Sequence, residues 1–598
     1  MLKRLLSNDR ITPPSMRWKA VSPEEYRKIY LESIRDPFSF WEREARRLKW
    51  ARVWSRIYEG SPPRAKWFVC GLIDAFYNII GKHRDTWVWH KPALIYENEA
   101  GDARVITYSE LDALTRRAAS GMKALGVKPG DWVLIYSQPS IEATVAALAS
   151  VRIGAPFEMV FTGFGYYELA KRIKDTKPRL IFVSGGYTRR GRRVDVLSTA
   201  RRAIEAARYQ EEVVVIEEGA PALRDNEISF QRLLSMSNTP VEGFVAPSDH
   251  PLFGLHVAYQ DDYKLIVHGT GGYLVQTYST STWIGIRPRD TYFCTVWPGW
   301  ITGITYVVFG PLMIGATVVL YDGGPDHPTW DRWWRIIEDY AVTIFLTTSG
   351  ALHILSKRGG EAIRSRNVDT LKAILVTAEP LYPETWHWAY TIVGTGKTPM
   401  IDSIPDRLTG RIPVVNLYIQ SELGTFVTGN LINYTFPPIA PGSAGTPIPG
   451  FNIAVVNDRG EPVVDSVGKL VVLSPWPAMP VDYPLEYEEK WRQGYYETGD
   501  YGYATSDGYI YVLGRADNVA KVSGYRLSPG ALEKALAEVF GVKARVLRVR
   551  DEDRFESLII EYEGDVEPDI IRSFIKTSIS PIAEPREVIR RSMQAAHR

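Results

Sequence analysis

The sequence predicts an α/β protein: a large N-terminal region of two α/β subdomains plus a β-rich subdomain, followed by a small α+β C-terminal domain. Three observations predict this fold. Short apolar runs alternate with helix-like segments from residue 93 on, which indicates largely parallel sheets. Short β segments with frequent glycine and proline follow residue 441, and a helix–strand–strand–helix pattern ends the chain. A chain of 598 residues is long enough for several cores, at about 150 residues per domain.

The individual elements follow from local patterns. The stretch "ALIYENEAGDARVITYSEL" predicts a hairpin and then a helix that is capped by Ser109 and ends at Gly126. The run "DWVLIYS" is continuously apolar, as is typical of a strand covered on both faces. Near the C-terminus, Ser528 is the expected cap of a helix with Pro529 at its first position. Further strands are expected at "RLIFVSG", "EVVVIEEG", "ATVVLYDG", "VTIFLTTSG" and "AILVTAEPL".

The N-terminal segment is rich in aromatic and charged residues. Trp41, Leu48, Trp50 and Trp54 recur at partly helical spacing, which predicts an amphipathic helix docked on the main body. We therefore divide the chain into an N-terminal docking segment (1–92), the α/β subdomains (93–440), the β-rich subdomain (441–517) and the small mobile C-terminal domain (518–598).

Composition excludes several classes of function. The net charge of +2 gives no electrostatic case for nucleic acid or an acidic membrane. The only two cysteines, Cys70 and Cys294, argue against a disulfide framework or a cysteine-based zinc site and fit a reducing compartment. No signal peptide is apparent, and the longest apolar run, 306–321, is shorter than the roughly 20 residues of a membrane span. We expect a cytoplasmic protein that binds neither nucleic acid nor membrane.

The string "YYETGDYGYATSDGYIYVLGRADNVAKVSGYRLSPGALE" carries the strongest chemical signal. Asp500 ends a predicted β segment, and its carboxylate can accept two hydrogen bonds from a vicinal diol such as a ribose. Arg515 and Arg526 supply fixed cations suited to phosphate or carboxylate. Each residue alone is a weak signal, but the ordered set is specific.

With this string, the chain resembles the AMP-forming acyl-CoA synthetases of the adenylating superfamily, and the acetyl-CoA synthetases in particular. The resemblance covers almost the whole chain and includes "FWEREARRLKWARVW", "MVFTGFGYYELAKRI", "AEPLYPETW" and "IQSELG". It implies that a carboxylate reacts with ATP to give acyl-AMP and pyrophosphate, and that the acyl group then passes to the thiol of CoA. It also implies ATP or AMP, CoA and Mg²⁺ as cofactors, and a nucleotide with a small carboxylic acid or acyl-CoA as ligands.

The resemblance implies roles for individual residues. Glu422 is expected to hold Mg²⁺, a hard cation that prefers oxygen ligands. Arg189 and Arg192 are expected to meet the phosphates of CoA, unless they belong to a solvated basic loop. The C-terminal domain is expected to swing about a hinge at Asp517. The nucleotide is expected to contact Ala378, Glu379, Pro380, Asn416, Leu417, Tyr418, Asp500, Arg515 and Arg526.

The acyl pocket is also implied by the resemblance, and its expected lining is Ile301, Thr302, Thr377 and Ile419. In acetyl-CoA synthetases a tryptophan at the place of Ile419 closes the pocket to long chains. Isoleucine removes the volume of an indole, so any bound acyl group is expected to be larger than acetyl.

The first departure from the family is in the phosphate loop. Relatives carry text like T-S-G-S-T-G-K-P-K-G, whereas "HVAYQDDYKL" stands here before an intact "IVHGTGGYL". Glycines let consecutive backbone N–H groups converge on phosphate oxygens, and this stretch has none. Asp261 and Asp262 add negative charge where pyrophosphate would lie, and each charge pair repels by about 4 kcal/mol at ~4 Å and an effective dielectric of ~20. Lys264 matches the loop lysine in position but can pair with an aspartate instead.

The second departure is at the C-terminus. Relatives end in text like "LPKTRSGKIMRR", whose lysine stabilises charge during adenylation, but this chain ends "SPIAEPREVIRRSMQAAHR". One alignment places Glu587 at the lysine position, and the other deletes the motif. Both remove the cation, and losing one preorganised charge of this kind costs about 2.7–4 kcal/mol, about a hundred- to a thousandfold in rate.

Three functions remain open from the sequence. The leading hypothesis is an acetyl-CoA-synthetase-like protein that is weak or inactive in adenylation but still binds a nucleotide, an acyl group or CoA. Such a protein would act as a regulatory subunit, with an intact synthetase as a candidate partner. The alternative is an active short- to medium-chain acyl-CoA synthetase whose loop binds phosphate in another way. The third keeps only the transfer of an acyl group to CoA, a step that does not need the pyrophosphate loop.

Overall fold

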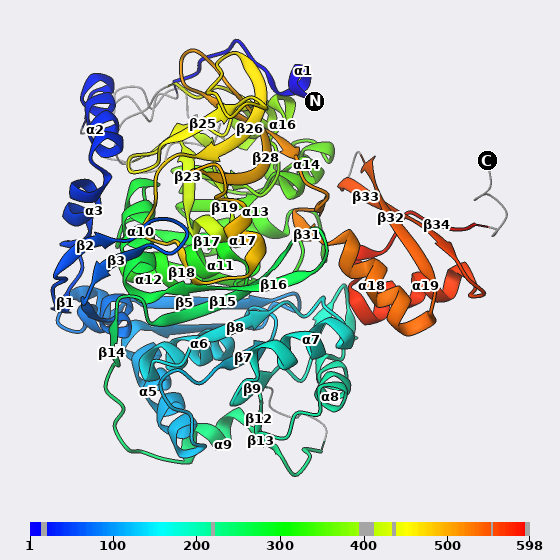
Figure 1. The fold of residues 1–598 in the computed structure, drawn as a ribbon. Helices are drawn as coiled ribbons and strands as arrows, with labels where there is room; N and C mark the ends of the chain where they lie inside the picture. The colour runs from blue at the N-terminus through cyan, green and yellow to red at the C-terminus, as the bar shows by residue number, and fades with distance from the viewer. Residues whose placement is uncertain (13–20, 217–221, 394–411, 433–437, 552–553, 592–598) are drawn as a thin grey trace.

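A large main body and a small C-terminal domain beside it make up the molecule (Figure 1). The computed structural model describes residues 1–12, 21–216, 222–393, 412–432, 438–551 and 554–591. The predicted fold class is confirmed, because two mostly parallel sheets with helices, a β-rich part and an α+β C-terminal unit are all present. In the described residues no helix has both the length and the apolar composition to cross a bilayer.

The first large sheet has eight strands in the order β13-β12-β9-β7-β8-β15-β16-β27. Neighbours from β13 to β15 are parallel, whereas β15, β16 and β27 pair antiparallel. The helices α6, α7 and α8 lie in the connections that parallel pairing requires, and α5 leads from the other large sheet into β7. The strands are β7 (Val133–Tyr136), β8 (Phe157–Val160), β9 (Leu180–Val183), β12 (Val213–Val215), β13 (Glu227–Ser229), β15 (Pro251–Ala258), β16 (Tyr263–Gly269) and β27 (Pro480–Asp482), and the helices are α5 (Tyr108–Ala124), α6 (Ile141–Ile153), α7 (Tyr166–Thr176) and α8 (Val196–Ala207).

The second large sheet has the order β21-β20-β19-β17-β18-β5-β6 and is parallel except for the β5–β6 hairpin. Its central strands are buried on both faces, which explains their continuous apolar sequences. The strands are β5 (Pro92–Asn98), β6 (Ala103–Thr107), β17 (Thr291–Cys294), β18 (Thr317–Asp322), β19 (Ile344–Thr348), β20 (Ala373–Thr377) and β21 (Val414–Asn416).

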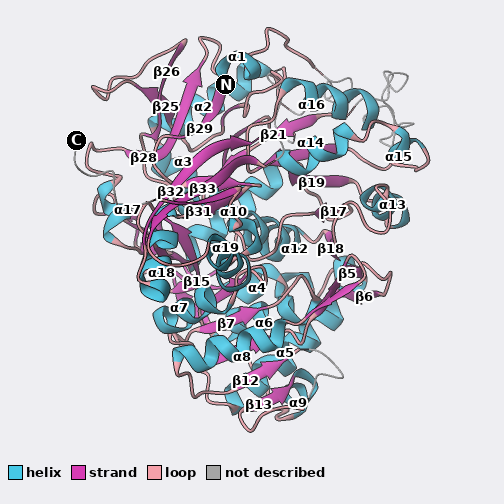
Figure 2. Cartoon of the chain, turned by 90° about the vertical axis from the view of Figure 1, so that its right-hand side faces the viewer, coloured by secondary structure: helices cyan, strands magenta, loops and turns pink. Residues whose placement is uncertain are grey.

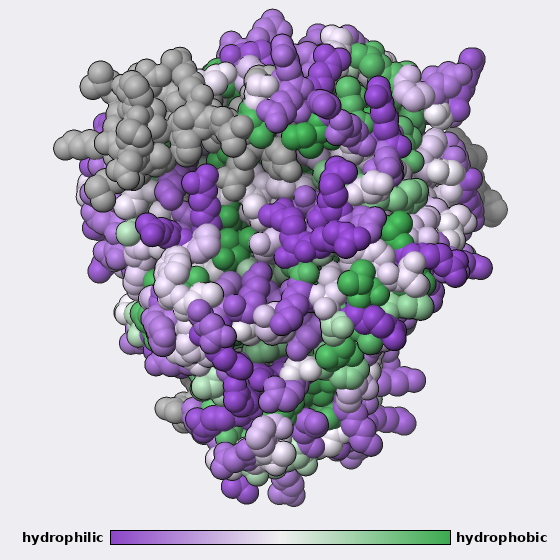
Figure 3. All heavy atoms as spheres, turned by 90° about the vertical axis from the view of Figure 1, so that its left-hand side faces the viewer, coloured by the Kyte–Doolittle hydropathy of each residue, from purple (hydrophilic) through white to green (hydrophobic). Residues whose placement is uncertain are grey.

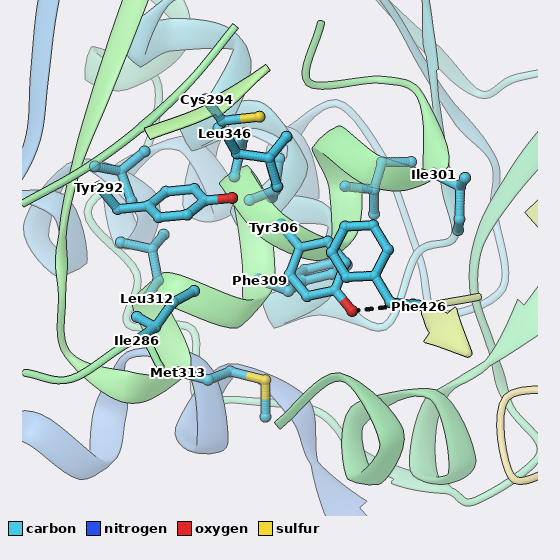
Figure 4. Close-up of a cluster of buried hydrophobic side chains, with 14 of the residues drawn as sticks. Ile286, Tyr292, Cys294, Ile301, Tyr306, Phe309, Leu312, Met313, Leu346 and Phe426 are labelled. Carbon is cyan, nitrogen blue, oxygen red and sulfur yellow. Dashed lines mark hydrogen bonds between the residues drawn. The ribbon is translucent and has the colours of Figure 1, made fainter. Parts of the chain in front are cut away.

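A buried helical layer packs within the main body (Figure 4). It contains α10 (Thr270–Trp283), a π-helix (Ile304–Phe309) and α12 (Gly310–Ile314), which leads into β18. The ring of Tyr306 stacks on Phe426 with centroids 4.3 Å apart, and its hydroxyl accepts from the Phe426 backbone N–H at 3.1 Å. Ile301 lies at the edge of this cluster in Figure 4, so the core directly supports one wall of the site described below.

The β-rich part contains a four-stranded antiparallel sheet, β25-β26-β28-β29, and a small sheet, β22-β23-β24. Asp500 lies inside β28 and faces Arg515 of β29 in register, so the prediction that it ends a β segment is wrong. Cross-strand pairing, which brings opposite residues within contact, holds this acid–base pair together. The strands are β22 (Tyr418–Ile419), β23 (Phe426–Gly429), β24 (Thr446–Pro447), β25 (Ile453–Val456), β26 (Ser466–Val472), β28 (Tyr496–Ala504) and β29 (Ile510–Arg515).

The C-terminal domain faces the viewer in Figure 2 and packs helices on one sheet, which is antiparallel except for the parallel pair β33–β34. The Ser528 hydroxyl caps its first helix by accepting from the Ala531 N–H at 3.1 Å, and Pro529 is the first helical residue, as predicted. The elements are β30 (Ala520–Val522), β31 (Tyr525–Leu527), α18 (Pro529–Phe540), β32 (Lys543–Asp551), β33 (Phe555–Glu563), α19 (Pro568–Phe574) and β34 (Glu587–Arg590).

The N-terminal segment docks on the main body, but not as one helix. Helix α3 (Pro37–Ala45) buries Trp41 completely against Trp283. The helix ends at Ala45, whose carbonyl accepts from the indole N–H of Trp50 at 3.0 Å, and Trp50 begins strand β1 (Trp50–Arg52). A side chain that satisfies an orphan helix carbonyl favours termination there. Polar side chains dominate this face of the molecule (Figure 3).

Helix α5 corrects a second local prediction. Its cap is Thr107 rather than Ser109, because Thr107 accepts from the Glu110 N–H at 3.2 Å while the Glu110 carboxylate accepts from the Thr107 N–H at 2.7 Å. This reciprocal capping box satisfies two orphan donors, and the helix ends at Ala124.

Candidate functional site

Several parallel strands of the second sheet end at one edge, and a cavity lies beyond them. Strands β17, β19 and β20 end next to Thr295, Thr348 and Ala378, which all line a cavity of about 240 Å³. In open α/β sheets, ligands bind outside the carboxyl ends of the strands, so this cavity is the first candidate site.

The C-terminal domain supplies the opposite wall of this cavity. Its β30–β31 hairpin inserts Lys521, Tyr525 and Arg526, and the Tyr525 ring packs 5.3 Å from that of Trp300. The lining residues are Leu255, His256, Val257, Ala258, Tyr263, Thr295, Val296, Trp297, Trp300, Ile301, Thr302, Trp333, Thr348, Ala351, Ala378, Tyr418, Ile419, Gln420, Ser421, Asp500, Lys521, Ser523, Gly524, Tyr525 and Arg526.

Asp500 is held rigidly at the cavity wall. Its Oδ2 accepts from the Tyr418 hydroxyl and the Gln420 amide, both at 2.7 Å, and its Oδ1 has a longer contact of 3.4 Å to Arg515. Burial would raise the pKa of Asp500, but the charge of Arg515 holds it below its usual range. The carboxylate therefore stays ionised, and its Oδ1 keeps capacity for a ligand hydroxyl.

Arg515 connects this carboxylate to the start of the C-terminal domain. Its Nε donates to Asp517 at 2.8 Å, and its Nη2 makes a second, short bond to the same carboxylate. The proposed hinge residue is thus bound to the wall of the cavity. Whether Asp517 acts as a hinge stays a prediction.

Glu379 separates the cavity from a larger neighbour of about 560 Å³, which Glu379 and Pro380 both line. Its Oε2 accepts from the Gly350 N–H at 2.8 Å, whereas its Oε1 is buried without a hydrogen-bond partner among the described residues. Burial raises the pKa of Glu379, partly opposed by Lys521. An orphaned buried acceptor costs about 1–3 kcal/mol, and a donor on a bound ligand, such as the amino group of adenine, would satisfy it.

Ala378 precedes Glu379 and has a φ of 79°. A non-glycine residue rarely adopts this left-handed conformation. Backbone strain at the rim of a cavity is typical of functional sites.

Lys521 is a cavity cation that the sequence analysis missed. Its neighbours Ala520 and Val522 pack in the core of the C-terminal domain, so strand alternation turns Lys521 to the opposite face, where it lines the cavity. Its side chain forms no ion pair in the described part of the chain, and burial lowers its pKa against the opposing charges of Asp500 and Glu379. The alternation within "NVAKVSG" was the signal that could have revealed it.

Glu422 is fully buried, and each of its oxygens is already bound to a cation. Lys490 Nζ lies 3.1 Å from Oε1, and Arg526 Nη1 lies 3.2 Å from Oε2. Although burial alone would raise the pKa of Glu422, Lys490 and Arg526 hold it far below its usual range. No cluster of metal-ligating side chains occurs in the described residues, and this carboxylate is a poor ligand for Mg²⁺. Lys490 lies outside every motif, so no sequence signal pointed to it.

The stretch that replaces the phosphate loop is a hydrogen-bonded hairpin. Strands β15 and β16 keep one register from Phe253 and His268 up to Ala258 and Tyr263, and the Tyr259 N–H donates to the Asp262 carbonyl at 2.9 Å. The backbone N–H groups that converge on phosphate in a glycine-rich loop are here used in the ladder and its turn.

The two aspartates of this hairpin differ. Asp262 Oδ1 lies 2.6 Å from Lys171 Nζ, and its pKa, which burial would raise, is held low by Lys171. Asp261 is exposed and forms no ion pair within the described ranges. The expected partner Lys264 is therefore not the one that neutralises Asp262.

The hairpin tip binds the C-terminal domain. The Gln260 carbonyl accepts from the Ser528 hydroxyl and the Gly530 N–H, both at 3.1 Å. The backbones approach so closely that a Cβ on Gly530 would lie 2.7 Å from the Asp261 Cα. The tip is thus a contact between the two parts of the molecule.

The predicted acyl-pocket residues separate in the structure. Ile301, Thr302 and Ile419 line the smaller cavity. Thr377 lies behind it and donates to the Leu417 carbonyl at 3.0 Å. Asn416 likewise binds the Ser443 carbonyl at 3.0 Å and does not line either cavity.

Arg189 and Arg192, the expected ligands of the CoA phosphates, lie on the β10–β11 hairpin (Tyr187–Arg189 and Arg192–Val194). Arg189 is bound to Glu99 at 2.9 Å and to Asp322 at 2.6 Å, whereas Arg192 is exposed. Two carboxylates neutralise Arg189, which weakens its case as a phosphate ligand and leaves Arg192 as the available cation.

Glu587 begins strand β34, which pairs with β33 of the C-terminal domain. It is exposed and lines neither of the two cavities. The stretch 581–591, which one alignment matches to the expected catalytic motif, lies within the described part of the chain, and residues 592–598 lie outside it.

Comparisons with known proteins agree with this geometry. The AMP-binding enzyme family matches residues 83–251 and 263–480, and the family described as acetyl-coenzyme A synthetase N-terminus matches 26–79. The interruption, 252–262, falls on β15 and the altered turn.

Individual relatives are similar along nearly the whole chain. The acetyl-coenzyme A synthetase of Pyrobaculum aerophilum is 34% identical over 97% of this chain and 89% of its own length, and that of Chlorobaculum tepidum is 32% identical over 98% and 90%. The solved acetoacetyl-CoA synthetase from Streptomyces lividans has the same fold, with a TM-score of 0.76 and 23% identity over 94% of this chain and 86% of its own. The chain therefore belongs to the AMP-binding enzyme family and is an acetyl-CoA-synthetase-like member of it.

Proposed function

We propose that this protein binds AMP or an acyl-adenylate in the 240 Å³ cavity, is weak or inactive in ATP-dependent adenylation, and acts as a binding or regulatory subunit. One observation carries this proposal: the phosphate loop is replaced by a closed hairpin whose Tyr259 N–H donates to the Asp262 carbonyl. A triphosphate needs several converging donors, and here they are used within the protein.

The nucleoside side of the cavity supports binding. Asp500 stays ionised and keeps acceptor capacity for a ribose diol. Glu379 lines the neighbouring 560 Å³ cavity, and its Oε1 lacks a donor, which the amino group of an adenine extending to that wall would supply. Lys521 and Arg526 line the same cavity and would offset the charge of a single phosphate.

The acyl side supports a chain longer than acetyl. Ile301, Thr302 and Ile419 line the cavity, and isoleucine leaves more room than the tryptophan expected in an acetyl-specific pocket. Branched C4–C5 acyl groups should therefore be preferred over acetyl. Equal binding of acetyl- and isovaleryl-adenylate analogues would contradict this.

The third hypothesis also has a structural observation in its favour. The C-terminal domain already contributes Lys521, Tyr525 and Arg526 to the cavity, so an acyl-adenylate would meet both parts of the molecule. Transfer of the acyl group to CoA does not require pyrophosphate contacts, and Arg192 is an exposed cation for the CoA phosphates. The alternative, an active short- to medium-chain synthetase, requires phosphate contacts outside the hairpin.

Three measurements on the purified full chain separate these functions. ATP–pyrophosphate exchange across a panel of C2–C8 carboxylates should be absent or weak, acyl transfer from synthetic acyl-AMP to CoA tests the third hypothesis, and calorimetry should detect AMP. Exchange at the rate of an intact acetyl-CoA synthetase would overturn the proposal, and failure to bind AMP would remove its basis. Sedimentation of a mixture with an intact synthetase tests the subunit role.

A further inference from the structure

The carboxylate expected to hold a metal is already neutralised by the protein itself. Glu422 is fully buried, and Lys490 and Arg526 each bind one of its oxygens, at 3.1 and 3.2 Å. Both cations are largely buried, with 14% and 18% of their side chains exposed. Both oxygens are thus occupied from within the chain.

A divalent cation does not fit beside this arrangement. Mg²⁺ binds oxygen at about 2.1 Å, so an ion on Oε1 would lie within about 5 Å of Lys490, and an ion on Oε2 within about 5 Å of Arg526. At an effective dielectric of about 20, each of these contacts would repel by about 6 kcal/mol. Glu422 can hold a metal only after one of the two cations has moved away.

Lys490 is fixed by more than the ion pair. Its Nζ lies 5.3 Å from the ring centroid of Tyr259 and 5.6 Å from that of Tyr496, within the range of cation–π attraction. Tyr259 is the first residue of the altered turn. The segment that replaces the phosphate loop therefore also encloses the ammonium group, so the altered turn and the Glu422–Lys490 pair form one physical unit.

We propose that Lys490 is a positioning residue whose ammonium group takes the place of a metal ion, so that a phosphate-bearing ligand binds this cavity without a divalent cation. The inference rests on the proposed function for the ligand, a nucleoside monophosphate. Arg526, which lines the cavity, is shared between Glu422 and that ligand. Lys490 neutralises enough of the negative charge of Glu422 to leave Arg526 available to the phosphate.

The first test needs no nucleotide. Electron paramagnetic resonance of Mn²⁺ titrated into the full chain should find no stoichiometric site in the wild type. Lys490→Met should create one, and adding Glu422→Gln should abolish it again. A wild-type Mn²⁺ site that disappears in Glu422→Gln would overturn the inference.

The second test measures AMP affinity by calorimetry, once in EDTA and once in about 5 mM Mg²⁺. Wild-type affinity should change less than about twofold between the two. Lys490→Met should bind about tenfold more weakly in EDTA and regain affinity with Mg²⁺, while Lys490→Arg keeps metal-independent binding. Lys469→Met, which breaks the surface pair with Glu497, is the matched control and should match the wild type.

The outcomes separate the two proposals. AMP binding that strengthens tenfold or more with Mg²⁺ in the wild type would overturn the role of Lys490 and leave the proposed function intact. Absence of AMP binding would overturn the proposed function, and the Mn²⁺ titration would still decide the role of Lys490. If Lys490→Met fails to fold, the wild type and Lys490→Arg decide both tests.

Discussion

The two sides of the candidate site have diverged to different degrees. On the nucleoside side, Asp500 on β28 is held by Tyr418 and Gln420 with a free acceptor toward the cavity. On the phosphate side, a closed hairpin stands in place of a glycine-rich loop, and Lys490 forms an ion pair with Glu422. The two sides are built on different strands, so one can lose its phosphate chemistry while the other keeps its ribose contacts.

The largest expected effect comes from the nucleoside side. Asp500→Asn should lower the free energy of unfolding by about 3 kcal/mol, because it leaves buried Arg515 without one of its two carboxylates. AMP affinity should fall at least about tenfold. Urea denaturation and calorimetry measure the two effects. Asp517→Asn removes the other, more exposed partner of Arg515 and should cost less; equal losses would contradict the special role given to Asp500.

The next effect concerns pH and His268, on β16 after the altered turn. Its ring nitrogens lie 2.9 Å from the Ala478 carbonyl and 2.8 Å from the Ser421 carbonyl, and burial lowers its pKa to about 4. The unfolded value is about 6.5, so the stabilisation is complete above pH 6.5 and is lost as the pH falls toward 4. At pH 5 the loss should be about 2 kcal/mol for this group.

The matched control for this pH effect is His83, whose pKa burial also lowers to about 4. The difference between the urea midpoints at pH 7 and pH 5 should be smaller in His268→Gln than in the wild type. His83→Gln should reduce this difference by a similar amount. His268 contacts the carbonyl of Ser421, which lines the cavity, whereas His83 contacts that of Leu312, which does not, so only His268→Gln should alter AMP affinity. An unchanged pH dependence in His268→Gln would contradict the assignment.

A smaller effect tests the phosphate side. Asp262→Asn should lower the free energy of unfolding by about 1 kcal/mol, because it breaks a partly buried pair with Lys171. Hydrogen exchange should also increase in residues 528–531, which the hairpin tip contacts. Asp261→Asn, at the exposed neighbour, should stay within about 0.5 kcal/mol of the wild type. The same loss from both variants would show that the tip is not a specific contact.

The sequence predicted the fold class because its signals are local and repeated. Continuous apolar runs became the buried parallel strands, and Ser528 and Pro529 began their helix as expected. The cap of α5 was misplaced because Thr107 and Ser109 are both good cap residues, and only the reciprocal bond with Glu110 decides between them. Helix α3 is shorter than predicted and ends at Ala45, because the indole N–H of Trp50, five residues further on, donates to the Ala45 carbonyl.

The candidate site was predicted where a motif orders its residues and missed where distant residues meet. Asp500, Arg526 and Tyr418 reach the same cavity as the motifs imply. The ion pairs of Glu422 with Lys490 and of Asp262 with Lys171 join residues 68 and 91 positions apart. No local pattern encodes such pairs, so the charge balance of the phosphate side appears only in the folded chain.

The most direct test of the account is the affinity of the purified full chain for AMP compared with ATP, measured by calorimetry in the same buffer. The account predicts that ATP binds at least about a hundredfold more weakly, because one unpaired charge such as Asp261 near the outer phosphates repels by up to about 4 kcal/mol and the hairpin offers them no converging donors. ATP binding as tight as AMP, or tighter, would contradict it.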